Sequence, residues 1–346
     1  MTIYRSKAPL RIGLAGGGTD VSPYCDLYGG AILNATISLY ANATIEPLAE
    51  DTIYLEAVDR EENISFPHVS AVTTHQGPLL LARGACVHIA RKYGPLPSGF
   101  KLTTFVDAPA GSGLGSSSTL LVAILGAFAE WLHLPLGEYD IAHMAYTIER
   151  EELSMAGGKQ DQYAATFGGI NFMEFFAENR VIVNPLRIKQ EYLLELGNNL
   201  LLYFTATSRY SSDIIAAQSR NVQEKKKEPI EAMHQLKQQA FMMKEAILKG
   251  NIDEIGRILD YGFQNKKQMA AGISNESMDK IYETALQAGA TGGKISGAGG
   301  GGFMMFYCPG NTRHAVQKAL ADFGGRFQAY DFVEHGLTTW SIADNH

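Results

Sequence analysis

Hydrophobic and polar positions along the first half of the chain predict a mixture of strands and helices. Residues 31–39 and 52–58 are rich in β-branched and apolar residues, which is typical of strands, and residues 100–106 predict a third strand. Residues 116–133 form a long apolar run that predicts a helix. Residues 138–153 place apolar side chains on one face of a second helix.

The pattern changes in the second half of the chain. Residues 212–288 combine polar faces with helix-capping candidates, so they predict mostly helix. A glycine-rich loop at 292–302 leads into an apolar strand at 303–307. A helix near 312–323 and a strand near 326–333 are expected after it.

This change divides the chain into two parts. We expect an N-terminal α+β domain over residues 1–185 and a C-terminal α+β domain over residues 186–346, without internal repeats. The 346 residues are enough for a large buried core. Hydrophobic residues make up 46% and charged residues 19%, as in an ordinary soluble enzyme.

Charge and cysteine content narrow the class of protein. The formal net charge is -7 and the densest basic run, Lys225 to Lys227, is flanked by glutamates, so nucleic acid is a poor partner. The most apolar run, Thr119 to Trp131, is shorter than the ~20 residues of a membrane span. Three widely spaced cysteines suggest a reducing compartment. We expect a cytoplasmic protein without a membrane partner.

Glycines concentrate in three segments. The first glycine-rich segment is residues 8–20, the second is 109–118 and the third is 294–302. In the second, alternating glycines allow close backbone approach and the serines open a helix, whose free N–H groups can hold phosphate. A turn with a serine cap is the simpler alternative, but it needs fewer glycines. The predicted phosphate-binding residues are Gly111, Ser112, Gly113, Leu114, Gly115, Ser116, Ser117 and Ser118.

Other phosphate motifs do not fit. Gly293-Lys294 lacks the remaining residues of a Walker A loop. Asp322-Phe323-Gly324 follows no His-Arg-Asp catalytic loop, so its likeness to a protein kinase is chance. Residues 297–302 fit a dinucleotide fingerprint but precede a strand, whereas that fingerprint follows one.

In their order and spacing, the three segments resemble the signature motifs of the GHMP kinases, a family that includes galactokinase and the homoserine, mevalonate and phosphomevalonate kinases. The match spans Lys7 to Phe306. The resemblance implies the α+β two-domain GHMP kinase fold, with an N-terminal domain like domain 2 of ribosomal protein S5 and a ferredoxin-like C-terminal domain. It also implies ATP as phosphoryl donor, the second segment as its phosphate loop, and Mg²⁺.

The resemblance assigns the catalytic pair. Asp161 matches the family's active-site aspartate, which accepts or orients the proton of the attacking hydroxyl group. Arg11 matches the basic residue beside that aspartate, where a cation keeps the carboxylate ionised and stabilises the transferring phosphoryl group. On their own, the two residues could equally be a loop acid and a surface arginine.

The resemblance also implies substrate and metal ligands. The first and third segments are expected to line the substrate, and the residues implied there are Gly17, Gly18, Asp20, Gly297, Gly299 and Gly300. Ser117 matches the family's metal-linked serine. Helical phase brings Glu149 and Glu152 toward the apolar side. The resemblance, in which an acid precedes the catalytic aspartate at this spacing, implies Glu149 as the second metal ligand; Glu152 stays the alternative.

The resemblance to one branch of the family suggests the substrate. Residues 8–20, 158–163 and 272–275 most resemble the branch that phosphorylates the anomeric hydroxyl of D-glycero-D-manno-heptose 7-phosphate. Arg209, Lys266 and Lys267 could bind the phosphate of such a sugar, although surface basic residues are the simpler alternative. An L-fucose kinase, a diphosphate decarboxylase and a non-catalytic sugar and ATP sensor remain alternatives. A homodimer is left open.

Overall fold

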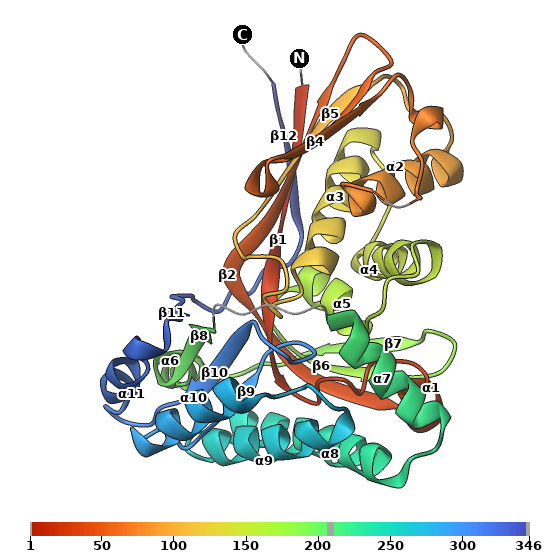
Figure 1. The fold of residues 1–346 in the computed structure, drawn as a ribbon. Helices are drawn as coiled ribbons and strands as arrows, with labels where there is room; N and C mark the ends of the chain where they lie inside the picture. The colour runs from red at the N-terminus through yellow and green to blue at the C-terminus, as the bar shows by residue number, and fades with distance from the viewer. Residues whose placement is uncertain (1, 76, 206–210, 344–346) are drawn as a thin grey trace.

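The large sheet organises the upper part of the molecule and continues through β6 and β7 into its lower half (Figure 1). The computed structural model describes residues 2–75, 77–205 and 211–343. Strands follow the order β12-β1-β2-β5-β3-β4, and β6 and β7 extend the sheet from β2. These strands are β1 (Thr2–Ala15), β2 (Gly30–Pro47), β3 (Ile53–Ala57), β4 (Glu62–Phe66), β5 (Phe100–Val106), β6 (Ile170–Phe175), β7 (Val181–Pro185) and β12 (Thr338–Ala343).

Helices cover one side of this sheet (Figure 1). The apolar helix α3 contacts both β1 and β2, and its Phe128 and Trp131 rings pack against Phe100 of β5. A π-helical turn, Thr147–Glu152, follows α4 directly; such turns often occur at functional sites. The helices that precede β6 in the chain are α1 (Tyr24–Tyr28), α2 (Leu80–Tyr93), α3 (Ser116–Leu132), α4 (Glu138–Tyr146) and α5 (Gln160–Phe167), of which α1 lies in the lower half of Figure 1.

The lower part of the molecule is built on a smaller sheet with the order β11-β8-β10-β9. Its strands are β8 (Leu200–Phe204), β9 (Gly292–Ile295), β10 (Phe303–Tyr307) and β11 (Arg326–Phe327). Its helices are α6 (Gln190–Asn199), α7 (Ser211–Gln223), α8 (Lys227–Lys249), α9 (Glu254–Met269), α10 (Glu276–Gln287) and α11 (Arg313–Ala319).

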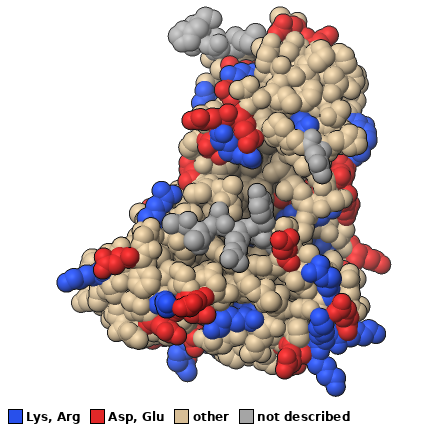
Figure 2. Space-filling view, in the orientation of Figure 1, with Lys and Arg blue, Asp and Glu red and all other residues tan. Residues whose placement is uncertain are grey.

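The two parts share a hydrophobic core. Leu10 and Ile12 of β1 belong to the same buried cluster as Met243 of α8 and Met305 of β10. Burial of apolar side chains from both sheets in one cluster ties the parts together. On the face shown in Figure 2, acidic and basic side chains of the described residues are interspersed. Within the described residues, no helix is long and apolar enough to cross a membrane.

Most elements predicted for the first half are confirmed: residues 31–39, 52–58, 100–106 and 116–133 fall in β2, β3, β5 and α3. The strand predicted near 326–333 is wrong for most of its length, because only Arg326–Phe327 pairs with β8. The chain then crosses toward the large sheet, where Phe332 forms an isolated bridge with Ile37.

The division of the chain at residue 185 stays a prediction. In the structure, a strand from the end of the chain joins the sheet of the N-terminal part, because β12 pairs antiparallel with β1 along Thr2–Lys7. Residues 338–343 therefore complete the edge of the large sheet, although they belong to the second half of the sequence.

Candidate active site

The three glycine-rich segments meet between the two sheets. The backbone N–H of Arg11 in the first segment donates to the Leu114 carbonyl of the second, at 3.2 Å. Phe303, directly after the third segment, donates its N–H to the Ser112 carbonyl at 2.9 Å. Segments far apart in the sequence are thus fixed to one another by backbone hydrogen bonds.

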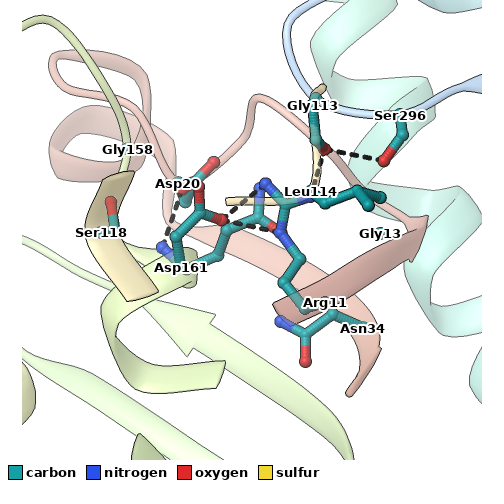
Figure 3. Close-up of polar contacts among 12 residues, drawn as sticks. Arg11, Gly13, Asp20, Asn34, Gly113, Leu114, Ser118, Gly158, Asp161 and Ser296 are labelled. Carbon is teal, nitrogen blue, oxygen red and sulfur yellow. Dashed lines mark hydrogen bonds and ion pairs between the residues drawn. The ribbon is translucent and has the colours of Figure 1, made fainter. Parts of the chain in front are cut away.

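Arg11, which is buried, and Asp161, which is partly exposed, form an ion pair (Figure 3). Arg11 lies on β1, and its Nε and Nη2 atoms lie 2.7 and 2.6 Å from Oδ1 of Asp161, in the first turn of α5. Its Nη1 donates to the Gly113 carbonyl at 2.7 Å, and the Ser296 hydroxyl donates to the same carbonyl at 2.8 Å. The guanidinium therefore holds the aspartate beside the second segment, in the pairing that the resemblance implied.

Asp20 holds the start of the helix that carries Asp161. Its Oδ2 accepts from the backbone N–H groups of Lys159 and Gln160 at 2.8 and 3.0 Å. Burial, and to a lesser degree the charge of Asp161, raises the pKa of the Asp20 carboxyl above its ordinary value. A Cβ on Gly158 would lie 1.9 Å from this oxygen, so glycine is required there. A contact between Asp20 and substrate stays a prediction.

The glycines of the second segment bring loops into contact. Gly111, Gly113 and Gly115 have φ values of 73°, 79° and 78°, and α3 begins directly afterwards. A Cβ on Gly113 would lie 2.5 Å from the carbonyl oxygen of Ser296, and one on Gly115 would lie 3.0 Å from Cγ of Asp161. Close approach between protein segments is thus a second reason for glycine here, besides the predicted approach of phosphate. The assignment of residues 111–118 to ATP phosphates stays a prediction.

Glu149 is buried within hydrogen-bonding distance of the second segment. It lies on the π-helical turn, is fully buried, and accepts from the hydroxyls of Ser117 and Ser118 at 3.1 and 2.6 Å. Gln162 Nε2 donates to it at 2.7 Å, and Arg150 Nη1 lies 3.3 Å away. The structure therefore brings the predicted pair Ser117 and Glu149 together.

Glu152 lies elsewhere. It pairs with two residues of α2, with His88 at 2.8 Å and with Arg91. Among the described residues, no group of three or more His, Cys, Asp and Glu side chains could hold a metal by itself. A serine hydroxyl and a single carboxylate do fit a hard cation that takes its other ligands from phosphate oxygens and water. Of the two acids, the geometry favours Glu149.

The predicted glycines of the first segment face the lower part of the molecule. The Gly18 carbonyl accepts from Gln218 Nε2 of α7 at 2.7 Å. A Cβ on Gly17 would lie 3.7 Å from Nζ of Lys266 and 3.9 Å from Nζ of Lys294. Gly17 therefore lies beside two lysine ammonium groups.

The predicted glycines of the third segment are held by their neighbours. A Cβ on Gly297 would lie 2.7 Å from Cα of Gly113, and one on Gly299 would lie 2.7 Å from the Ile273 carbonyl oxygen. Gly300 donates its N–H to the same carbonyl at 2.8 Å. The third segment is thus placed between the second segment and the loop before α10, and its contact with substrate stays a prediction.

The basic residues predicted to bind a substrate phosphate differ in their burial. Arg209 lies outside the described residues. Lys266 is buried, whereas Lys267 is exposed and lies 3.8 Å from Asp279. The sequence singled out Lys294 only when a Walker A loop was excluded, yet this lysine is buried beside the first segment. No local sequence signal could have found it, because β9 is only four residues long and reads Gly-Gly-Lys-Ile.

A cavity of about 290 Å³ is lined in part by Asp20. It is bounded by the end of the first segment, by the loop before α5 and by α7. Polar side chains that line it include those of Asp20, Arg150, Lys159 and Ser219. This volume and lining could accept part of a small polar ligand at Asp20.

Comparisons with known proteins agree with this arrangement. Residues 80–169 match the GHMP kinases N terminal domain, and residues 243–326 match the GHMP kinases C terminal domain. The D-glycero-alpha-D-manno-heptose 7-phosphate kinase of Campylobacter jejuni is 43% identical over 99% of this chain and 100% of its own length. The L-fucokinase/L-fucose-1-P guanylyltransferase of Bacteroides fragilis is 27% identical over 86% of this chain and 34% of its own length.

Solved structures give the same result. A D-glycero-D-manno-heptose 1-phosphate kinase from Bacteroides thetaiotaomicron matches with a TM-score of 0.81 and 44% identity, covering 99% of this chain and 100% of its own. A Lactococcus lactis galactokinase shares the fold at 18% identity, with a TM-score of 0.79 and coverage of 97% and 95%. The chain belongs to the GHMP kinase family, and the predicted α+β GHMP kinase fold is confirmed.

Proposed function

We propose that this GHMP kinase transfers the γ-phosphoryl group of ATP to the anomeric hydroxyl group of D-glycero-D-manno-heptose 7-phosphate. The observation that carries the choice of sugar is the full-length likeness to the Campylobacter jejuni heptose 7-phosphate kinase, at 43% identity. The L-fucokinase is more distant, at 27% identity, and remains the second candidate.

Asp161 is the proposed proton acceptor. Both Arg11 contacts are made to Oδ1, which leaves Oδ2 for the sugar hydroxyl. As the hydroxyl oxygen forms its bond to the γ-phosphorus, its proton passes to Asp161, and the bond from the γ-phosphorus to the bridging oxygen of ADP breaks. General-base help of this kind contributes about 10²–10⁴ in rate. The Arg11 cation stabilises the ionised aspartate and the charge on the phosphoryl group in transfer.

The second segment and Glu149 would hold the nucleotide and its metal. The N-terminus of α3 offers free N–H groups and a partial positive charge to phosphate oxygens. Ser117 and Glu149 would hold Mg²⁺, which when bound neutralises phosphate charge. We expect these steps to take place in the cytoplasm, since all three cysteines are free and buried.

A substrate screen tests this proposal. ADP release is measured with D-glycero-D-manno-heptose 7-phosphate, unphosphorylated heptose, L-fucose and galactose, and phosphorus NMR locates the new phosphate. We expect the heptose phosphate to exceed the others by at least about two orders of magnitude in kcat/KM, since charge-assisted hydrogen bonds contribute about 1.5–3 kcal/mol each. A neutral sugar as the best substrate would reject the heptose proposal and leave the kinase assignment standing.

A further inference from the structure

Two buried lysines converge on the first glycine-rich segment from different elements of the lower part. Lys266 comes from α9 and Lys294 from β9, and each is 4% exposed. Nζ of Lys294 donates to the Gly13 carbonyl at 2.5 Å, and Nζ of Lys266 donates to the Gly297 carbonyl. Both ammonium groups also lie within 4 Å of the position that a Cβ on Gly17 would occupy.

Neither lysine has an acidic partner within the described part of the chain, where the hydrogen bonds of both ammonium groups go to backbone carbonyls. Burial, with the charge of Arg11 as a further cause, lowers the pKa of Lys266 to about 8. Burial and the charges of Lys266 and Arg11 lower the pKa of Lys294 well below its usual range. Buried cations without a counter-ion are costly, and a bound anion would remove that cost.

An unpartnered hydrogen-bond acceptor lies at the same place. The side-chain oxygen of Gln160, the residue before Asp161, is buried and has no hydrogen-bond partner. A Cβ on Gly13 would lie 3.8 Å from this oxygen and 3.7 Å from Nζ of Lys294. The site thus offers several N–H donors for an anion and one acceptor for a hydroxyl group, which together match a phosphorylated sugar.

We infer that Lys266 and Lys294 bind the phosphate group that the sugar already carries, and that Gln160 accepts a hydrogen bond from one of its hydroxyl groups. This inference deepens the proposed function and rests on it. The neighbouring Lys267 offers a matched control, because it is exposed and its ammonium group lies 4.8 Å from the centre of the Phe263 ring. The other source of phosphate at this site would be the γ-phosphoryl group of ATP, and the experiment separates the two.

The first experiment compares two sugars in four proteins. The wild type and the variants Lys266→Met, Lys294→Met and Lys267→Met are assayed with heptose 7-phosphate and with unphosphorylated heptose at saturating ATP. We expect the ratio of the two kcat/KM values to fall at least about tenfold in each of the first two variants, because each loses one charged hydrogen bond, and to stay unchanged in Lys267→Met. An equal loss with both sugars, or no loss, would overturn the inference.

A second experiment does not depend on the identity of the sugar. Inorganic phosphate is titrated calorimetrically into each protein with the non-hydrolysable analogue AMP-PNP bound. We expect phosphate to bind the wild type and Lys267→Met at least about tenfold more tightly than Lys266→Met or Lys294→Met. Equal binding, or no binding to the wild type, rejects the lysine site even when the kinase is active.

The outcomes of the two proposals can be told apart. A wild type that releases no ADP with heptose 7-phosphate, yet binds phosphate through the lysines, refutes the proposed sugar and keeps the site. Melting temperatures check that each variant is folded. Removing an unpaired buried charge should leave the melting temperature at or above that of the wild type. If a methionine variant fails to fold, the polar substitution Lys266→Gln or Lys294→Gln replaces it at the same position.

Discussion

Charge is arranged differently on the two sides of the first glycine-rich segment. On the side of the large sheet, the Arg11 guanidinium pairs with Asp161, and Glu149 accepts hydrogen bonds from serine hydroxyls. On the side of the small sheet, the ammonium groups of Lys266 and Lys294 contact backbone carbonyls. The difference indicates that the groups proposed for chemistry are oriented before substrate binds, whereas the lysine side is complete only with an anion from the ligand.

The largest effect is expected from removing the proposed proton acceptor, Asp161, on the side of the large sheet. In Asp161→Asn the side chain keeps its size but loses its negative charge, so we expect turnover to fall about 10²–10⁴-fold. Affinity for an ATP analogue, measured by calorimetry, should change little because the phosphate loop is intact. Turnover within tenfold of the wild type would contradict the proposed role of Asp161.

Replacing the buried acid near the phosphate loop should have the next largest effect. Glu149→Gln removes the only proposed carboxylate ligand of Mg²⁺, so the Mg²⁺ concentration for half-maximal ADP release should rise at least about tenfold. Glu152→Gln is the matched control, since that acid pairs with His88 and Arg91 away from the site. If only the control variant shows the effect, Glu152 is the ligand and the choice of Glu149 is wrong.

The unpaired side can be tested by pH. Lys266, which is close to Arg11, Asp20 and Lys294, has a pKa lowered to about 8 from 10.5. Above pH 8 it loses its proton, so KM for the sugar phosphate should rise about tenfold between pH 7 and 9 in steady-state kinetics. The dependence should disappear in Lys266→Met; a KM that stays flat in the wild type would argue against a charged Lys266.

The same lysine has the opposite effect on stability. Between pH 8 and 10.5, Lys266 is more protonated in the unfolded protein than in the folded protein. Its contribution to the free energy of unfolding therefore increases as the pH rises through this window. Chemical denaturation of the wild type and Lys266→Met across this range would isolate that contribution. A contribution that decreases with rising pH would mean that the folded pKa is not lowered.

The smallest expected effect concerns the contact between the loops. Gly113→Ala places a Cβ 2.5 Å from the Ser296 carbonyl at a φ of +79°, whereas Gly324→Ala has a similar φ of +73° and open space. Both variants pay the cost of positive φ, about 1 kcal/mol, but only the first must move the third segment. We expect the melting temperature to fall several degrees further in Gly113→Ala. Equal losses would show that the contact carries no strain.

Elements and residues that depend on a local sequence pattern could be predicted from the sequence. The glycine-rich segments and α3 follow from spacing and periodicity alone, whereas helical phase placed Glu149 and Glu152 alike on the inner side and only Glu149 is buried there. Lys294 could not be found in this way, because one lysine in a short strand has no repeating pattern and its importance depends on contact with the distant Gly13. The hydrogen bond from the Lys159 N–H to Asp20 could not be predicted either, since the start of helix α5 becomes a neighbour of Asp20 only in the folded chain.

The return of β12 to β1 has a consequence for how the protein is made. Strand β1 carries Arg11, but one of its edges stays open until residues 338–343 have been synthesised. During translation that edge offers unpaired N–H and carbonyl groups to other chains, which favours aggregation. Pairing across nearly the whole sequence also slows folding, because a large loop must close first. The yield of active protein should therefore respond to slower synthesis and to chaperones more than to the stability of the finished fold.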